Sequence, residues 1–175
     1  ELTRLAGALG RQAELAEALG QAAALAEGSN RIALLAQAAA VHRSELGNAG
    51  RAIELDRAIL ADAPPGDPAA LTAARDLDGL LAEQGLAAER CDVLERLATM
   101  EPEAAARRAA RAELSRIAWA EVGDPERAIR AYRAALAEDA GDEEARAGLI
   151  EALERIGRWD ELIAALEARA ARGEG

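Results

Sequence analysis

The chain has 175 residues, and its 32 acidic and 21 basic residues give a formal net charge of −11. A body this acidic repels phosphate backbones, so nucleic acid is not an expected partner. No window approaches 18 consecutive apolar residues, so no membrane insertion is expected. Hydrophobic residues make up 51% of the chain but aromatic residues only 2%. Alanine and leucine dominate and favour helices, whereas strand-forming residues are scarce, which predicts an all-α fold.

Glycines that follow helix-like segments divide the chain at regular intervals. They are Gly10, Gly47, Gly85, Gly123 and Gly157, at spacings of 37, 38, 38 and 34 residues. Glycine closes the last turn of a helix in the left-handed conformation. We therefore expect about five antiparallel helical hairpins in one repeat domain over 1–175. Their predicted ranges are 1–28, 29–66, 67–102, 103–141 and 142–175.

Capping signals mark the expected helix starts in chain order. Ser29-Asn30 can cap the segment after Gly28, and Asp67-Pro68 and Asp124-Pro125 each place Pro at the first helical position. Further along, Asp142-Glu143-Glu144 places acid at the positive end of a helix. These signals support predicted breaks between helices near 10–11, 27–30, 47–49, 63–67, 85–86, 101–103, 123–124, 140–142 and 157–158.

The segment 109–142 resembles a tetratricopeptide repeat, a helix–turn–helix unit of 34 residues. Ala128, Tyr132 and Ala135 reproduce the small, aromatic and small residues of the second helix, and Trp119 stands at an aromatic position of the first. HEAT-like repeats are the alternative. The resemblance implies a right-handed superhelical solenoid whose hairpins touch only their neighbours and form a concave groove.

The resemblance also implies which residues face the groove, namely positions on the first helix of each hairpin. The expected partner-binding residues are Gln37, Val41, Arg75, Glu113, Ile117 and Glu151. Acidic, apolar and small groups dominate these positions, unlike the basic clamps that bind the tails of chaperones. We therefore expect a protein or peptide partner with basic residues and an apolar anchor.

No constellation in the sequence points to catalysis or to a cofactor. His42 and Cys91 are the only residues of their kinds and lie far apart in the sequence, so no zinc-ligand spacing exists. Carboxylate pairs such as Glu143-Glu144 are explained as helix caps. The sequence therefore predicts no enzyme, no metal and no cofactor.

Two functional hypotheses remain, a protein-interaction scaffold and a structural spacer or self-association segment. The chain starts inside an apolar-periodic segment, which is expected of a piece of a larger bacterial protein. Leu2, Leu5 and Leu9 have no helix before them, so an exposed terminal repeat is a candidate surface for homo-oligomers. No targeting signal is visible, which slightly favours the cytoplasm.

Overall fold

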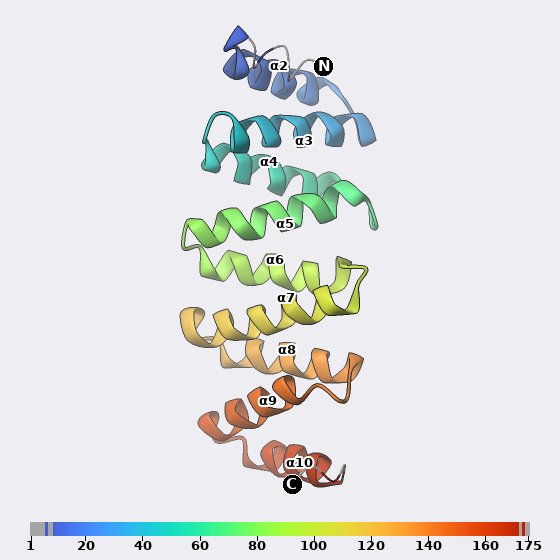
Figure 1. Ribbon diagram of the computed structural model, residues 1–175, viewed down its shortest axis with the longest axis vertical. Coiled ribbons are helices and arrows are strands. Elements are labelled where there is room, and N and C mark those ends of the chain that lie inside the picture. The colour runs from blue at the N-terminus through green and yellow to red at the C-terminus, as the bar shows by residue number, and fades with distance from the viewer. Residues whose placement is uncertain (1–5, 7–8, 172, 174–175) are drawn as a thin grey trace. The chain divides into compact units, whose positions relative to one another are not determined.

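The computed structural model describes residues 6, 9–171 and 173, and every regular element in these residues is helical (Figure 1). The helices divide between two compact units, residues 1–86 and 87–175. Unit 1 contains α2 (Gln12–Leu25), α3 (Gly28–Ser44), α4 (Ala49–Asp62) and α5 (Pro68–Glu83). Unit 2 contains α6 (Ala87–Met100), α7 (Ala104–Ile117), the π-helical turn η1 (Ala118–Val122), α8 (Pro125–Glu138), α9 (Glu143–Ile156) and α10 (Trp159–Ala170).

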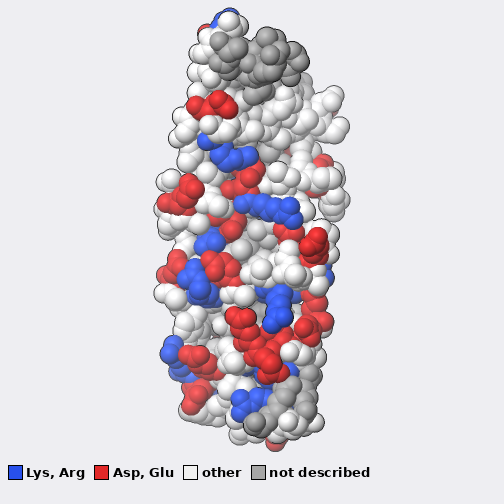
Figure 2. All heavy atoms as spheres, in the orientation of Figure 1, with Lys and Arg blue, Asp and Glu red and all other residues white. Residues whose placement is uncertain are grey.

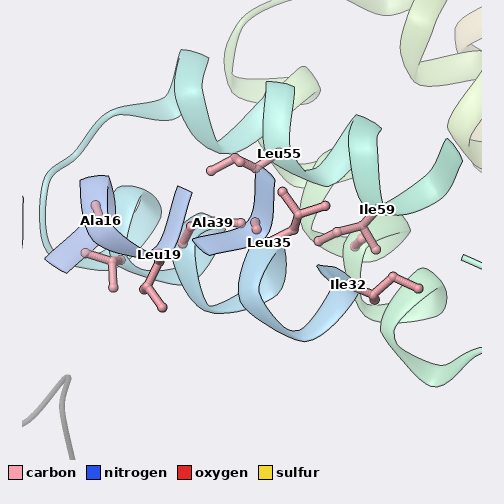
Figure 3. Close-up of a cluster of buried hydrophobic side chains, with 11 residues drawn as sticks. Ala16, Leu19, Ile32, Leu35, Ala39, Leu55 and Ile59 are labelled. Atoms are coloured by element: carbon pink, nitrogen blue, oxygen red, sulfur yellow. The ribbon is translucent and has the colours of Figure 1, made fainter. Parts of the chain in front are cut away.

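Within each unit, helices that follow one another in the chain pack side by side and are joined by short turns. The core of unit 1 lies between α2, α3 and α4 (Figure 3). Leu19, Leu35 and Ile59 are buried there together with alanines such as Ala39. Short alanine side chains let neighbouring helices approach closely, so a core with few aromatic residues is still well filled.

Unit 2 has a second hydrophobic cluster, between α8, α9 and α10. Ile129, Leu149, Leu153 and Leu162 are buried in it, and Tyr132 packs against it. Cys91 is also completely buried, as expected of a small core residue. Burial raises the pKa of its thiol, which keeps it protonated and unreactive.

The capping signals are confirmed at three of the four expected helix starts. The carboxylates of Asp67, Asp124 and Asp142 accept hydrogen bonds from backbone N–H groups in the first turns of α5, α8 and α9. The prediction for Ser29-Asn30 is wrong, because α3 already begins at Gly28 and includes both residues in its first turn. The breaks observed between α3 and α10 coincide with those predicted to within two residues.

The repeat also appears in the backbone, at an interval of 76 residues, which is twice 38. Gly47 and Gly123 end α3 and η1 with φ of 59° and 73°. After them, Asn48 N donates to His42 O and Asp124 N donates to Ala118 O, both at 2.8 Å. Equivalent helix ends therefore close in the same way in the two units. The organisation of residues 1–175 as one domain of five hairpins stays a prediction.

Candidate partner-binding groove

A groove of about 620 Å³ runs between α7, α8 and α9 within unit 2. Small residues from all three helices line much of it. These small residues are Ala109, Ala112, Ala120, Ala131, Ala135, Ala145, Gly148 and Ala152. Two aromatic side chains, Trp119 and Tyr132, complete the apolar surface. An adjoining hollow of about 520 Å³ extends the groove toward the start of α7.

The position of the Tyr132 ring depends on a glycine in the next helix. A Cβ atom added to Gly148 would lie 2.4 Å from Cζ and 2.5 Å from Cε1 of Tyr132. No real contact is that short, so the ring occupies the space that a side chain at position 148 would take. The aromatic part of the groove therefore requires Gly148 on α9 as much as Tyr132 on α8.

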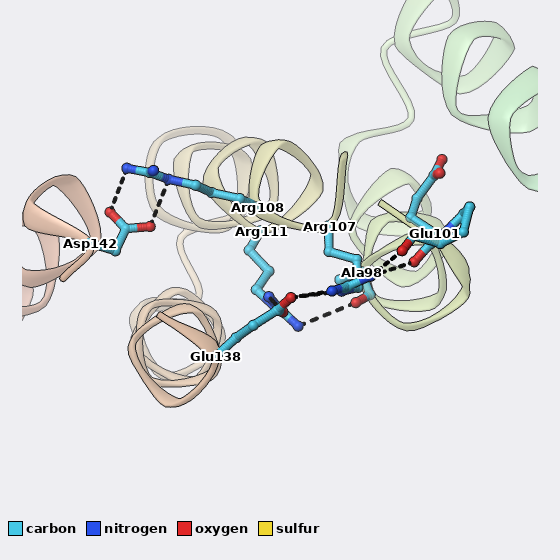
Figure 4. A network of polar contacts seen from close by, with 8 residues as sticks. Ala98, Glu101, Arg107, Arg108, Arg111, Glu138 and Asp142 are labelled. Carbon is cyan, nitrogen blue, oxygen red and sulfur yellow. Dashed lines mark hydrogen bonds and ion pairs between the residues drawn. The ribbon is translucent and has the colours of Figure 1, made fainter. Parts of the chain in front are cut away.

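One wall of the groove carries arginines from α7, each tied to a carboxylate of another helix or its cap (Figure 4). Arg108 binds Asp142 through two contacts, at 2.8 and 3.0 Å. Arg111 pairs with Glu138, which also pairs with Arg107. The hydrogen bonds from Arg107 and then Arg111 lower the pKa of Glu138 to about 2. These bidentate and shared contacts connect α7 to the end of α8 and the start of α9.

The opposite wall is acidic and belongs to α9. Glu144 and Glu151 both line the groove and are exposed. The side chain of Glu144 makes no hydrogen bond or ion pair with any residue that the structure describes. Among the described residues, the exposed Glu151 forms one ion pair, with Arg155 of its own helix, at 3.1 Å. Carboxylates on this wall are therefore available to a cationic partner. On the face of the molecule drawn in Figure 2, acidic and basic side chains are interleaved.

The structure brings two of the six expected partner-binding residues into this groove. Glu113 and Glu151 both line it, from α7 and α9. Glu113 is held by Arg116 at 2.9 Å and by Arg90 at 2.9 Å, and its pKa is lowered mainly by the hydrogen bond from Arg116. Glu113 is therefore an ionised group with two arginine partners, whereas Glu151 is exposed and has one partner, Arg155.

Two expected residues, Gln37 and Arg75, lie on the surface of unit 1. Gln37 is exposed on α3 and donates to its own helix at Ala33 O, 3.3 Å away. Arg75 borders a separate hollow of about 390 Å³ that Arg43 and Asp76 also line. Neither residue forms part of the groove in unit 2.

The structure contradicts the prediction that the remaining two residues, Val41 and Ile117, face a partner. Val41 is 2% exposed and Ile117 is 0% exposed, so neither can touch a partner in this structure. Ile117 follows the buried Leu114 by three residues and so lies on the same, core-facing side of α7. The family-based register therefore placed two core positions on the surface.

The residues that the sequence did not single out for the groove are Trp119, Tyr132 and Gly148. Tyr132 and Trp119 carried the family resemblance, but nothing local in the sequence shows that they share one groove. Their contacts depend on α8 and α9 meeting α7, and such meetings join positions far apart in the chain. Alanine-rich helix faces were the available signal, because small residues leave room for a ligand.

Unit 1 has a polar cluster in place of an aromatic one. Asp56 is 2% exposed, and its Oδ2 lies 3.5 Å from Nη1 of Arg43. Neither of these atoms has a hydrogen-bond partner among the described residues, and Arg43 makes its shorter contact, 2.7 Å, with Asp76. Burial raises the pKa of Asp56 to about 7, Arg43 opposes the rise and Asp76 adds to it.

The neighbouring His42 has a lowered pKa, because of its burial and then the charge of Arg51.

No group of three or more His, Cys, Asp or Glu residues within the described part of the chain is arranged to hold a metal ion. None of the described helices is long and apolar enough to span a membrane.

Consecutive helices that pack on their neighbours, with equivalent residues at a regular interval, define a helical-repeat protein. The tetratricopeptide repeat model matches residues 120–173. No curated protein has significant sequence similarity to the chain.

Solved structures resemble the chain along almost its whole length. The nearly identical TPR-like repeats of a Podosopora anserina protein described as a kinesin light chain have a TM-score of 0.51 at 23% identity, with 98% of this chain and 91% of that chain covered. MamA has a TM-score of 0.50 at 17% identity, covering 100% and 98%. A tetratricopeptide repeat protein from Parabacteroides merdae has a TM-score of 0.52 at 16% identity, with 99% of this chain and 65% of that chain covered.

The tetratricopeptide repeat model covers residues 120–173 of the chain, and the solved structures share its all-helical, solenoid-type fold. Proteins of this family are in general non-catalytic scaffolds that bind other proteins. The groove of unit 2 shows chemistry suited to that role, with an apolar floor and charged walls on either side.

Proposed function

We propose that the chain is a protein-interaction scaffold that holds a peptide segment of its partner in the groove between α7, α8 and α9. The observation that carries the proposal is the composition of this groove. Small residues line its floor, two aromatic rings offer an apolar anchor site, and Glu144 and Glu151 offer exposed carboxylates to basic side chains. A bound peptide would bury the aromatic surface and pair its basic side chains with these carboxylates.

The proposal is tested by selecting peptides from a random library on the immobilised chain and measuring the affinity of the winners for matched variants. Ala112 is exposed on α7 and lines the groove, so Ala112→Trp should fill the groove and weaken binding at least about tenfold. Ala134→Trp is the control, since Ala134 is exposed on α8 and does not line the groove. Equal binding by both variants would show that the groove is not the site.

A second candidate is the spacer or self-association segment, which one observation favours. Trp159, Ile163 and Leu166 lie at helical spacing on α10 and are 60%, 54% and 37% exposed. A second copy of the chain would cover this apolar stripe. Sedimentation over a range of protein concentrations tests this candidate. It predicts a dimer that Ile163→Glu dissociates, and a monomer at all concentrations would contradict it.

A further inference from the structure

One arginine at the edge of the groove contacts both an aromatic ring and a carboxylate that line it. The guanidinium carbon of Arg155 lies 5.6 Å from the centroid of the Trp119 ring, within the range of a cation–π interaction. Its Nη2 atom lies 3.1 Å from Oε1 of Glu151. Trp119 and Glu151 line the groove from different helices, η1 and α9. Together they make a place for one planar cation.

The hold on Arg155 is weak, which separates it from the arginines of the opposite wall. Arg108 and Arg111 bind carboxylates outside their own helix, and Arg111 is largely buried. Arg155 instead has a side chain that is 59% exposed, and its ion pair with Glu151 is a local contact four residues apart. Such local exposed pairs are readily broken in favour of a better partner.

We propose that Trp119 and Glu151 form a subsite for an arginine side chain of the bound peptide, and that Arg155 occupies this subsite in the free protein. The inference rests on the proposed function, since it names the chemistry of a ligand for the same groove. Arginine fits better than lysine, because its planar guanidinium stacks on an indole face while its N–H groups reach a carboxylate.

Glu144, the second exposed carboxylate on this wall, sets the spacing between the basic residues of the ligand. Glu144 and Glu151 are seven residues apart on α9 and both line the groove, so they share one helix face, about 10 Å apart along the axis. In a polyproline II segment, side chains three residues apart point the same way and are separated by about 9 Å along the axis. The matching ligand is an extended segment with arginines at positions i and i+3 and a small apolar residue between them for the alanine floor.

The experiment uses the fluorescence of Trp119 in a Trp159→Phe background, so that the reporter lies in the subsite itself. The probe is the peptide acetyl-Gly-Arg-Ala-Leu-Arg-Gly-amide, titrated to millimolar concentration at low ionic strength. A second peptide has citrulline, a neutral analogue of the same shape, at both arginines. We expect the arginine peptide to bind about four- to twenty-five-fold more tightly, from two exposed cation contacts of about two- to fivefold each.

Substitutions distinguish a subsite that Arg155 occupies in the free protein from a general attraction between the peptide and the acidic chain. Arg155→Ala should strengthen binding of the arginine peptide about two- to fivefold, because the competing guanidinium is gone. Glu151→Gln should weaken it and leave the citrulline peptide unaffected. Arg130→Ala is the matched control, since Arg130 is an exposed arginine of α8 that does not line the groove, and it should raise affinity less than Arg155→Ala does.

The two proposals fail in different ways. Equal affinity for both peptides, or weaker binding by Arg155→Ala, overturns the arginine subsite. If the probe fails to bind while library-selected peptides bind and are lost on Ala112→Trp, the subsite is overturned and the scaffold function stands. If neither the probe nor any selected peptide depends on the groove, both proposals are wrong.

Discussion

The two units place opposite chemistry at equivalent positions of the repeat. Unit 1 has Ile32 and Leu35 in its core, whereas 76 residues later unit 2 has Arg108 and Arg111 at its groove. At a second set of equivalent positions, on three successive helices, the exchange is reversed. The polar group of unit 1, Arg43, Asp56 and Asp76, corresponds to Trp119, Tyr132 and Ala152 in unit 2.

This exchange separates positions whose contacts are shared by both units from positions whose chemistry differs between them. Arg31 pairs with Asp62 and Arg107 pairs with Glu138, in both cases 31 residues apart. Each of these arginines also donates to backbone carbonyls at the end of the preceding helix. These arginine contacts, which hold neighbouring helices together, therefore repeat in both units, while the residues on the nearby surface differ. Within the described residues, only unit 2 combines small, aromatic and exposed acidic residues in one groove.

The largest expected effect tests whether the shared framework is equally tight in both units. Ala52 and Ala128 are equivalent and both 0% exposed. Replacing either by Trp should lower the free energy of unfolding by about 1–3 kcal/mol, because a filled helix interface cannot take an indole. Chemical denaturation checks this, with the exposed Ala134→Trp as the control. An effect in only one unit would mean that the two frameworks are not equivalent.

The next effect belongs to unit 1 alone and depends on pH. The pKa of Asp56 is about 7 in the folded protein against an ordinary value of 3.8, so the folded state binds its proton more tightly than the unfolded state. The resulting stability is present below pH 3.8 and is lost as the pH rises through 7. Between pH 6 and 8 the unfolding free energy of the wild type should fall by about 1 kcal/mol relative to that of Asp56→Asn.

This difference is measured by denaturing both proteins at each pH. Comparison with the variant is needed because His42 has a lowered pKa and destabilises the fold as the pH falls. That contribution is common to the two proteins and cancels. A constant difference across the pH range would show that Asp56 is ionised throughout, held by Arg43.

Helix caps at equivalent positions give a smaller effect. Asn48 accepts a hydrogen bond from Arg51 N at 3.1 Å, and Asp124 accepts one from Arg127 N at 2.9 Å. Substitution of either by Ala should cost about 1 kcal/mol of unfolding free energy. The loss should be larger for Asp124, whose charge also interacts with the helix dipole. Calorimetry of the two variants orders them, and a larger loss for Asn48→Ala would reverse our interpretation.

How much of this could be predicted from the sequence follows from the range of the interactions involved. Helix ends depend on local signals, such as Gly47 and Gly123 or Asp124-Pro125, and their positions were predicted closely. The groove depends on side chains of α7, α8 and α9 that meet only in the folded unit. Glu113 and Glu151 line the groove, and their role in partner binding stays a prediction. Ile117 is buried instead, because the helical period that places it beside Leu114 overrides the family register.

The smallest effect compares two glycines within helices. Gly79 on α5 has nothing within 4 Å of an added Cβ, so Gly79→Ala should stabilise unit 1 by about 0.5–1 kcal/mol through helix propensity alone. The same change at Gly148 gains the same propensity but forces the Tyr132 ring out of its place. It should therefore fail to stabilise unit 2, and Tyr132→Ala should restore the gain in the double variant. Denaturation of the single and double variants measures this coupling. If Gly148→Ala stabilised the chain as Gly79→Ala does, the ring would move freely, and the aromatic surface of the groove would not be preorganised for its ligand.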